Sequence, residues 1–303
     1  MHIRVLGSAA GGGFPQWNTN VGLNRALHEG TTNATARTQS SIAVSADGER
    51  WLLVNASPDV RQQILDFPAL RPAPDTRGTG IGAILLMDSQ IDHTAGLMIL
   101  REGSTLPVWS TRPVYQDLTT GLPLFTVLGH FCGVDWHEID TAAGAFTIDG
   151  VPGLSFRAVE LSSAAPPYSP HRGDPHPGDN IGLIVTDDTT GGTLFYAPGL
   201  GAPDEAIAAI ARAADCLLID GTFFTETEMI DQGVGTKPAA TMGHLPQSGD
   251  DGMLAWLDQF PDTRRVLIHI NNTNPILDPD SDERAVVENR GVEVAYDGME
   301  ITL

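Results

Sequence analysis

Two apolar runs in this chain each end in polar side chains of the types that bind metal ions. The run IGAILLMD predicts a buried strand and leads directly into Asp92 and His93, while the run VLIHI ends around His269. Polar residues at strand ends are where layered α/β folds place their sites. One carboxylate and two imidazoles form the facial set that suits non-haem Fe(II), and they would also hold Zn(II) with an open position.

The first of these clusters also has a purely structural interpretation. Asp88, Gln90, Asp92 and His93 crowd into one short stretch, DSQIDH. A helix that begins here, with Asp88 or Asp92 as its N-cap, would explain the same residues. The second cluster, HINNTNP, favours the metal interpretation because two strand-end sites in one chain are harder to explain structurally.

The pattern of apolar runs predicts the elements that would position these residues. SSIAVSADGERWLLVNASPD predicts two strands joined by an Asp-Gly turn, and residues 18–40 predict a loop. Further strands are predicted at the start of the chain and at 81–88, 107–109, 145–148, 154–160, 181–186, 193–197, 216–220, 265–270 and, last, 292–296. Helices are predicted from Asp59 to Leu65 and at 204–213, 250–259 and 281–289. This order predicts an α/β protein with two sheets sandwiched between helices.

Composition and charge exclude several classes of function. The chain has 17 Lys+Arg against 38 Asp+Glu, a net charge of −21, which repels nucleic acids and anionic membrane surfaces. The N-terminus has no secretory pattern, and no apolar run approaches the roughly 20 residues that span a bilayer. We therefore expect a cytoplasmic protein without nucleic-acid or membrane partners, in which Cys132 and Cys216 are buried thiols.

Several segments together resemble the coenzyme PQQ synthesis protein B family, which has the metallo-β-lactamase fold. They cover nearly the whole chain: LGSAAGGGFPQWN, RTQSSIAVS, NASPD, DSQIDH, REG, GVGT, MGH and HINNTNP. The resemblance implies a metallo-β-lactamase-type four-layer αββα sandwich in one domain, residues 1–303. The glycine-rich loop after the first strand lacks the spacing of a phosphate-binding turn, and we expect it to approach the site closely through its backbone.

The resemblance also implies one metal ion. DSQIDH stands in the place of the fold's His-x-His-x-Asp-His motif, so Asp88 and Gln90 replace the two histidines of the first metal site. Asp92, His93 and His269 keep the second site. Pro198 and Gly199 stand where a bridging Asp is usual, which argues against hydrolysis by a metal-bridged hydroxide.

The chain departs from the family in one loop. Many members carry three cysteines that bind a structural zinc, and here Thr19, Val21 and Asn24 take their places. We therefore predict no structural zinc. The departure leaves the order of residues 18–36 in question, and with it a homodimer that this loop would support.

The function implied by the resemblance is a step in the biosynthesis of pyrroloquinoline quinone (PQQ). Family members resemble oxygenases that use Fe(II) and dioxygen to hydroxylate the tyrosine ring of a small cross-linked Glu-Tyr substrate. The catalytic candidates are Asp88, Gln90, Asp220 and His244, although Asp220 could equally serve as an N-cap or turn residue and His244 as an outer partner. The substrate-binding candidates are Arg37, Gln39, Asn55, Asp59, Asn271 and Asn272.

Two other functions stay open from the sequence. A metal-dependent hydrolase would bind two metals, and a carrier would bind PQQ or its precursor without turnover. His171 and His176 lie in a proline-rich insertion at 158–180, where a surface loop is a simpler interpretation than a ligand pair.

Overall fold

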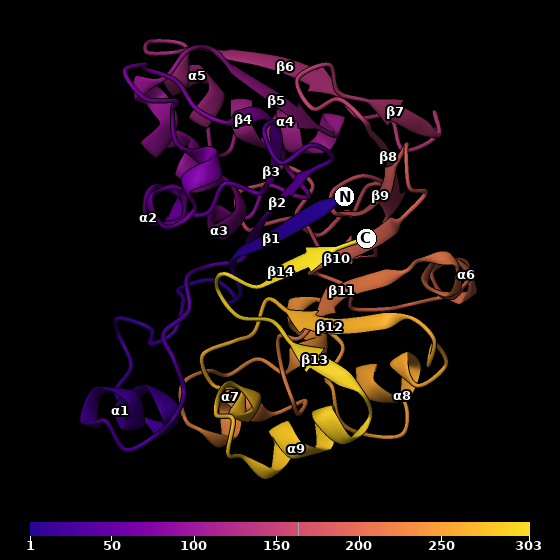
Figure 1. Ribbon diagram of the computed structural model, residues 1–303. Coiled ribbons are helices and arrows are strands. Elements are labelled where there is room, and N and C mark those ends of the chain that lie inside the picture. Colours follow the sequence, from indigo (N-terminus) through magenta and orange to yellow (C-terminus); the bar gives the residue numbers. More distant parts are fainter. Residues whose placement is uncertain (163) are drawn as a thin grey trace.

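The computed structural model describes residues 1–162 and 164–303, and within them the strands form two seven-stranded sheets (Figure 1). The first sheet has the order β14-β1-β2-β3-β4-β5-β6 and the second the order β13-β12-β11-β10-β9-β8-β7. The first comprises β1 (His2–Gly7), β2 (Ser41–Ser45), β3 (Trp51–Val54), β4 (Ile81–Leu85), β5 (Leu106–Ser110), β6 (Val134–Glu138) and β14 (Glu300–Thr302). The second comprises β7 (Ala145–Thr147), β8 (Leu154–Glu160), β9 (Ile181–Asp187), β10 (Thr193–Ala197), β11 (Cys216–Asp220), β12 (Arg264–Ile268) and β13 (Val292–Val294).

Both sheets are mixed, and each contains a parallel half. Strands β3 to β6 run parallel to one another in the first sheet, and β10 to β13 run parallel to one another in the second. The remaining neighbours are antiparallel, and the predicted hairpin of β2 and β3 is confirmed, with Ile42 opposite Val54. The metal-site candidates follow β4 and β12, which both belong to the parallel halves.

Helices cover the outer face of each sheet, which confirms the four-layer αββα arrangement. Side chains from α2 (Val60–Asp66), α4 (Arg112–Thr119) and α5 (Leu124–Leu128) pack in the outer core of the first sheet. Those from α6 (Glu205–Ala213), α8 (Met253–Leu257) and α9 (Asp282–Asn289) pack in the outer core of the second. The other helical segments are α1 (Gly22–Glu29), α3 (Ile91–Thr94), α7 (Glu228–Asp231) and the 3₁₀ turns Pro68–Leu70, Ala95–Glu102, Ala239–Met242 and Pro275–Leu277.

The period of two along each strand explains why the strands are apolar on both faces. In β3, Leu52 and Val54 enter the core between the sheets, whereas Leu53 enters the outer core. In β11, Leu218 enters the core between the sheets and Leu217 the outer one. Because alternate side chains meet two different cores, nearly continuous apolar runs are required.

The predicted loop at residues 18–40 is wrong in its first half, because α1 forms there. Leu23 and Leu27, four residues apart, pack against the outer core of the second sheet. Gly30 ends the helix in the left-handed conformation, with φ 67°. Figure 1 shows α1 projecting from the body of the molecule, so a few apolar contacts hold a helix that is otherwise polar.

The end of the chain also differs from the prediction. The strand predicted at 292–296 is β13, but it is not the last one: β14 follows and pairs antiparallel with β1, Ile301 opposite Ile3, in the other sheet. β14 has only three residues and pairs with the strand at the other end of the chain, so the local sequence pattern does not predict it. β6 was missed as well, because its side chains are half-buried or exposed.

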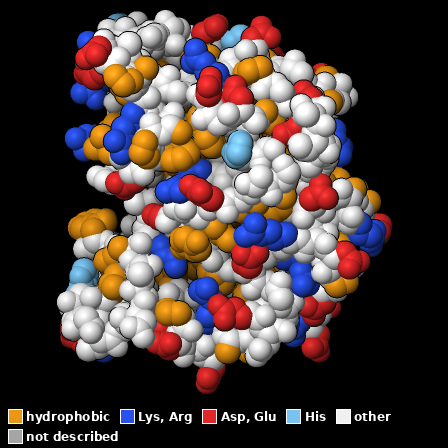
Figure 2. Space-filling model, viewed as in Figure 1, with side chains coloured by type: hydrophobic (Ala, Val, Ile, Leu, Met, Phe, Trp, Pro, Cys, Tyr) orange, Lys and Arg blue, Asp and Glu red, His pale blue; other side chains and the backbone are white. Residues whose placement is uncertain are grey.

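Two smaller expectations can be compared with the structure. Cys216 is buried as predicted, whereas the free thiol of Cys132 is half-buried, so the prediction for it is wrong. Among the described residues, no helix has the length and apolar character needed to cross a membrane. Figure 2 shows acidic and basic side chains interspersed on the face viewed, and an indentation between the α1 segment and the layer that holds α2 and α3.

Candidate metal centre

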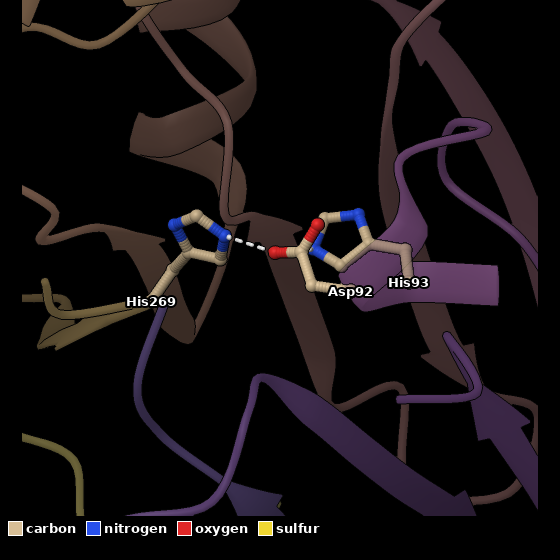
Figure 3. A group of neighbouring side chains, drawn as sticks. All are labelled: Asp92, His93 and His269. Carbon is tan, nitrogen blue, oxygen red and sulfur yellow. Dashed lines mark ion pairs between the residues drawn. The ribbon is translucent and has the colours of Figure 1, made fainter. Parts of the chain in front are cut away.

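Asp92, His93 and His269 meet between the two sheets, as the sequence predicts. Asp92 and His93 lie on α3, which begins shortly after β4, and His269 directly follows β12. Figure 3 shows the three side chains turned toward one another, with Oδ2 of Asp92 lying 3.4 Å from Nε2 of His269. The same oxygen lies 3.8 Å from Nε2 of His93, and one ligand atom from each residue falls within 4.8 Å of the others.

The environment of His93 fits a metal ligand. Its side chain is buried, and Nδ1 lies 2.8 Å from Oδ1 of Asp88. Its other ring nitrogen, Nε2, is buried and has no hydrogen-bond partner among the described residues. Buried polar atoms are rarely left unpaired, and a carboxylate behind the far nitrogen is the usual support of a metal-binding histidine.

The charges around this site keep Asp92 ionised. Burial acts to raise the pKa of Asp92, but His93 and His269 outweigh it, and the pKa is lowered. Burial acts to lower the pKa of His93, but Asp88 and Asp92 raise it to about 9. The carboxylates around His93 therefore favour positive charge here, and a metal ion, when bound, would take the place of the proton on His93.

His269 is held in an uncommon backbone conformation. Its φ is 61°, in the left-handed region that residues other than glycine rarely adopt. The hydroxyl of Thr222, which follows β11, lies 2.9 Å from Nδ1 of His269 and at the same distance from the carbonyl oxygen of His269. The contact directs Nε2 toward Asp92.

The glycine-rich loop approaches the site through its backbone, as expected. A Cβ on Gly11 would lie 3.2 Å from Oδ2 of Asp92, closer than ordinary side-chain contacts. A larger residue at this position would press on the metal-binding carboxylate, so glycine keeps the space around Asp92 open.

Asp220 and His244 form a pair beside His269. Oδ2 of Asp220, which is fully buried, lies 2.6 Å from Nδ1 of His244, and the rings of His244 and His269 are stacked at 5.5 Å. Burial acts to lower the pKa of His244, but the charge and hydrogen bond of Asp220, together with the charge of Asp92, outweigh it and the pKa is raised. Asp220, His244 and His269 also offer ligand atoms within 4.8 Å, but the hydrogen bonds already made by Asp220 favour its role as the partner that orients His244.

The comparisons with known proteins agree with this geometry. A model of the β-lactamase superfamily domain matches residues 50–270. Coenzyme PQQ synthesis protein B from Pseudomonas putida strain F1 is 60% identical over the full length of both chains, as is the protein of that name from Azotobacter vinelandii. The crystal structure of Zn(2+)-bound PqqB from Methylobacterium extorquens superposes with a TM-score of 0.90 over all of both chains, at 38% identity. The chain belongs to the coenzyme PQQ synthesis protein B family.

The metallo-β-lactamase fold of this family member is thereby confirmed. A diphosphatase of the PhnP family shares the fold with a TM-score of 0.69 at 18% identity, covering 99% of this chain and 96% of that one. Enzymes are usual in the superfamily, and the zinc in the PqqB crystal structure agrees with a site for a divalent metal here.

Asp88 and Gln90 occupy the positions predicted for a lost first metal site. Oδ1 of Asp88 accepts the backbone N–H of Gln90 at 2.9 Å in addition to its contact with His93. Gln90 is the N-cap residue of α3 and makes no side-chain cap hydrogen bond, so a helix does begin here but neither Asp88 nor Asp92 is its N-cap. The structural interpretation of DSQIDH therefore holds in part, and the metal interpretation stays a prediction.

Asn180 lies beside Gly199, one of the two residues predicted to stand in place of the bridging Asp. Its side-chain amide donates to the carbonyl of Gly199 at 3.1 Å, and a Cβ on Gly199 would lie 3.2 Å from that amide nitrogen. The backbone of Asn180 also pairs with that of Asp88. Sequence reasoning missed Asn180, because nothing in the local pattern distinguishes it from the rest of the insertion.

The six substrate-binding candidates all hydrogen-bond within the protein, and contact with substrate stays a prediction for each. Arg37 is buried and donates to Oγ of Ser8 at 3.1 Å, and Oδ1 of Asn55 accepts the N–H of Met87 at 3.0 Å. Asn55 also has a left-handed φ of 61°. These two side chains support the backbone around the site.

Gln39 and Asp59 brace the glycine-rich loop. Oδ2 of Asp59 accepts the backbone N–H of Gln39 at 2.9 Å and its side-chain amide at 3.0 Å. Oε1 of Gln39 in turn accepts the N–H of Gly12 at 2.9 Å. The pair therefore fixes the loop whose preceding residue, Gly11, lies against Asp92.

Asn24, one of the three residues predicted to replace family cysteines, joins α1 to the loop after His269. It is buried, its Oδ1 accepts the N–H of Gln16 at 2.8 Å, and its amide donates to Oδ1 of Asn272 at 3.0 Å and to the Asn272 carbonyl at 3.2 Å. The amide of Asn272 donates to Oε1 of Gln16 at 2.7 Å. Hydrogen bonds thus tie the start of α1 to this loop.

A second chain of hydrogen bonds runs from Asn271 to a buried carboxylate. Asn271 donates to the Thr273 hydroxyl at 2.5 Å, and Thr273 donates to Glu228 at 2.5 Å. Burial raises the pKa of Glu228 to about 7, although hydrogen bonds from Thr273 and the Phe224 backbone oppose the shift. Sequence reasoning missed Asn24 and Glu228 as partners of this loop.

His171 and His176 interact with each other. Their Nδ1 atoms lie 2.8 Å apart, and Nε2 of His171 contacts the Gln116 side chain at 2.9 Å. His176 is exposed, and neither residue belongs to a group of clustered ligand atoms in the described part of the chain. Residue 163 of the same insertion lies outside the described residues.

Proposed function

We propose that this protein binds one Fe(II) ion through Asp92, His93 and His269 and acts in PQQ biosynthesis. Its reaction would be the dioxygen-dependent hydroxylation of the tyrosine ring in the cross-linked Glu-Tyr precursor. The name shared by its relatives, coenzyme PQQ synthesis protein B, supports the pathway. The donor set of two imidazoles and one carboxylate supports the metal and the class of reaction.

The observation that carries the proposal is the unpaired Nε2 of His93. This buried atom faces Oδ2 of Asp92, while Nδ1 is already satisfied by Asp88. An imidazole with its outer nitrogen held and its inner nitrogen unpaired is positioned to bind a metal ion in place of a proton.

A single metal favours oxygenase chemistry over metal-bridged hydrolysis. Asp88 accepts hydrogen bonds from the Gln90 backbone and pairs with His93, so it acts as a support of the one site. Pro198 and Gly199 offer no bridging carboxylate. Hydrolases of this kind use a hydroxide held between two metals, for which these residues supply no ligands.

The residues around the metal position would serve the substrate and its protons. When bound, Fe(II) in such a set supplies dioxygen chemistry at its open coordination positions. His244, whose Nδ1 is held by Asp220, would take up or release a proton at Nε2. Asp220 would keep its contact with Nδ1 throughout and stabilise the charged ring.

The test is an anaerobic Fe(II) titration followed by oxygen uptake with the cross-linked Glu-Tyr substrate and a reductant. We expect one iron per chain and a product heavier by one oxygen atom, and both are lost in His93→Ala and His269→Ala. His130→Ala, a change at an exposed histidine, is the matched control and keeps both.

Other outcomes separate the rival functions. Iron-loaded protein that neither consumes oxygen nor changes the substrate would contradict the oxygenase, and tight binding of intact PQQ would then favour a carrier. Two zinc ions per chain with cleavage of a simple phosphodiester would favour a hydrolase.

A further inference from the structure

The hydroxyl group of Thr222 lies at the centre of the polar contacts behind the candidate metal centre. Thr222 is buried, two residues beyond the end of β11. Its Oγ1 lies 2.6 Å from Oδ1 of Asp220, 2.9 Å from Nδ1 of His269 and 3.1 Å from Nδ1 of His244. One oxygen atom therefore contacts a metal-ligand candidate and both members of the Asp220–His244 pair.

The count of hydrogens at this oxygen determines which nitrogen of His269 is protonated. A threonine hydroxyl has one hydrogen to donate and two lone pairs that accept. Both Asp220 and the His269 carbonyl can only accept, so the hydroxyl hydrogen is directed to one of them. The lone pairs of Oγ1 are then left to accept from Nδ1–H of His269, and the unprotonated Nε2 faces Oδ2 of Asp92.

The backbone of His269 depends on the same contact. Thr222 Oγ1 also reaches the His269 carbonyl at 2.9 Å, and this residue has the uncommon φ of 61°. A left-handed conformation at a residue with a side chain costs free energy and persists where its surroundings hold it in place. Thr222 therefore contacts both the ring and the backbone carbonyl of His269, the residue that presents the ligand atom.

We propose that Thr222 is a positioning residue that fixes His269 as the Nδ1–H tautomer and aims its Nε2 at the metal. The inference rests on the proposed metal centre and adds a residue to it. Thr222 contacts Nδ1 of His269 as Asp88 contacts Nδ1 of His93. The Thr222 group is a neutral hydroxyl, which in turn contacts the carboxylate of Asp220.

The fold does not depend on this hydroxyl. β11 and β12 are paired through their backbones, with Asp220 opposite Ile268, directly before the two residues in question. Asp220 would still accept the Thr222 backbone N–H at 2.9 Å and pair with His244. Thr222→Val, which keeps the shape of the side chain, should therefore fold.

The experiment measures Zn(II) affinity by competition with a chromophoric chelator. We expect Thr222→Val to weaken binding by about 10–100-fold, the usual cost of losing an outer partner of a ligand. Thr222→Ser restores the hydroxyl and should bind as the parent does. Thr111→Val is the matched control, because Thr111 is also buried and donates to a carbonyl, that of Gly178, at 2.6 Å.

A second readout addresses the tautomer itself. In ¹⁵N-histidine spectra of the zinc-loaded parent, assigned with His269→Ala, His269 should show a proton on Nδ1, and this signal should shift in Thr222→Val. Equal affinities of the parent and Thr222→Val, or a Thr222→Ser variant as weak as Thr222→Val, would overturn this proposal alone. A parent that binds no zinc would overturn the metal centre and this proposal with it.

Discussion

The two loops that supply the metal ligands are held in place in different ways. In the first metal loop, residues 88–94, the ring of His93 is held by a residue of the same loop, because Asp88 contacts both His93 and the Gln90 backbone. The second metal loop, residues 269–274, depends on partners far away in the sequence. Thr222 holds His269, Asn24 holds Asn272, and Glu228 holds Thr273.

The difference shows that similar ligands can have local or tertiary support. Asp88 lies five residues before His93 and reaches its ring directly. A histidine at the end of a strand, in a left-handed conformation, has no such neighbour in sequence. We therefore expect a change at Asp88 to affect metal binding more than stability, and changes at the distant partners of the second loop to affect stability as well.

The largest effect is expected from removing one ligand in each loop. His93→Ala and His269→Ala should each weaken Zn(II) binding by more than about 100-fold, beyond the usual cost of losing an outer partner. Competition with a chromophoric chelator measures the loss. Retention of parent affinity by either variant would show that its loop contributes no ligand.

The next effect is a dependence of stability on pH that belongs to the second metal loop. Folding raises the pKa of Glu228 from 4.5 to about 7, so the folded protein holds this proton more tightly than the unfolded chain. The contribution of Glu228 to stability is present below pH 4.5 and is lost as the pH rises to about 7, by about 3 kcal/mol in all.

Urea unfolding at pH 5 and pH 8 tests this dependence. Glu228→Gln should gain stability relative to the parent as the pH rises, whereas Glu29→Gln, a change at an exposed residue, should follow the parent. A constant difference between Glu228→Gln and the parent across this range would show that Glu228 is ionised in the folded state at pH 5.

A smaller loss of stability is expected from the contact between α1 and the second metal loop. Asn24→Leu removes the buried bonds to Gln16 and Asn272 and leaves their polar groups unpaired, at a cost of about 2 kcal/mol. Urea unfolding measures this cost. Asn33→Ala, at an exposed position on the same segment, should change stability by less than about 0.5 kcal/mol. Equal effects of the two changes would mean that Asn24 does not hold α1 in place.

The smallest effect is expected from the support within the first metal loop. Asp88→Asn keeps an oxygen that accepts from His93 but removes the charge, so Zn(II) affinity should fall by about tenfold, the low end for an outer partner. The midpoint of urea unfolding should stay near that of the parent. A large drop in stability with unchanged affinity would reverse the comparison between the loops.

The elements that could be predicted from the sequence are those whose signal is local. β8, β10 and β11 match their predicted ranges because apolar runs of this length, bounded by turn residues, specify a strand without reference to its partner. The three metal-ligand candidates share this property, since each stands at the end of such a run. β14 and α1 differ, because one depends on the opposite end of the chain and the other on packing of Leu23 and Leu27.

The sequence by itself determined that Asp92, His93 and His269 are metal-ligand candidates in the segments that follow two buried strands. Only the tertiary structure decided which side chains stand behind them. Thr222 meets His269 because β11 and β12 are neighbours in one sheet, and Asn24 meets Asn272 across 248 positions of sequence. Hydrophobic periodicity reports the burial of an element, but a hydrogen bond between two loops depends on the path of the whole chain, which no local pattern contains.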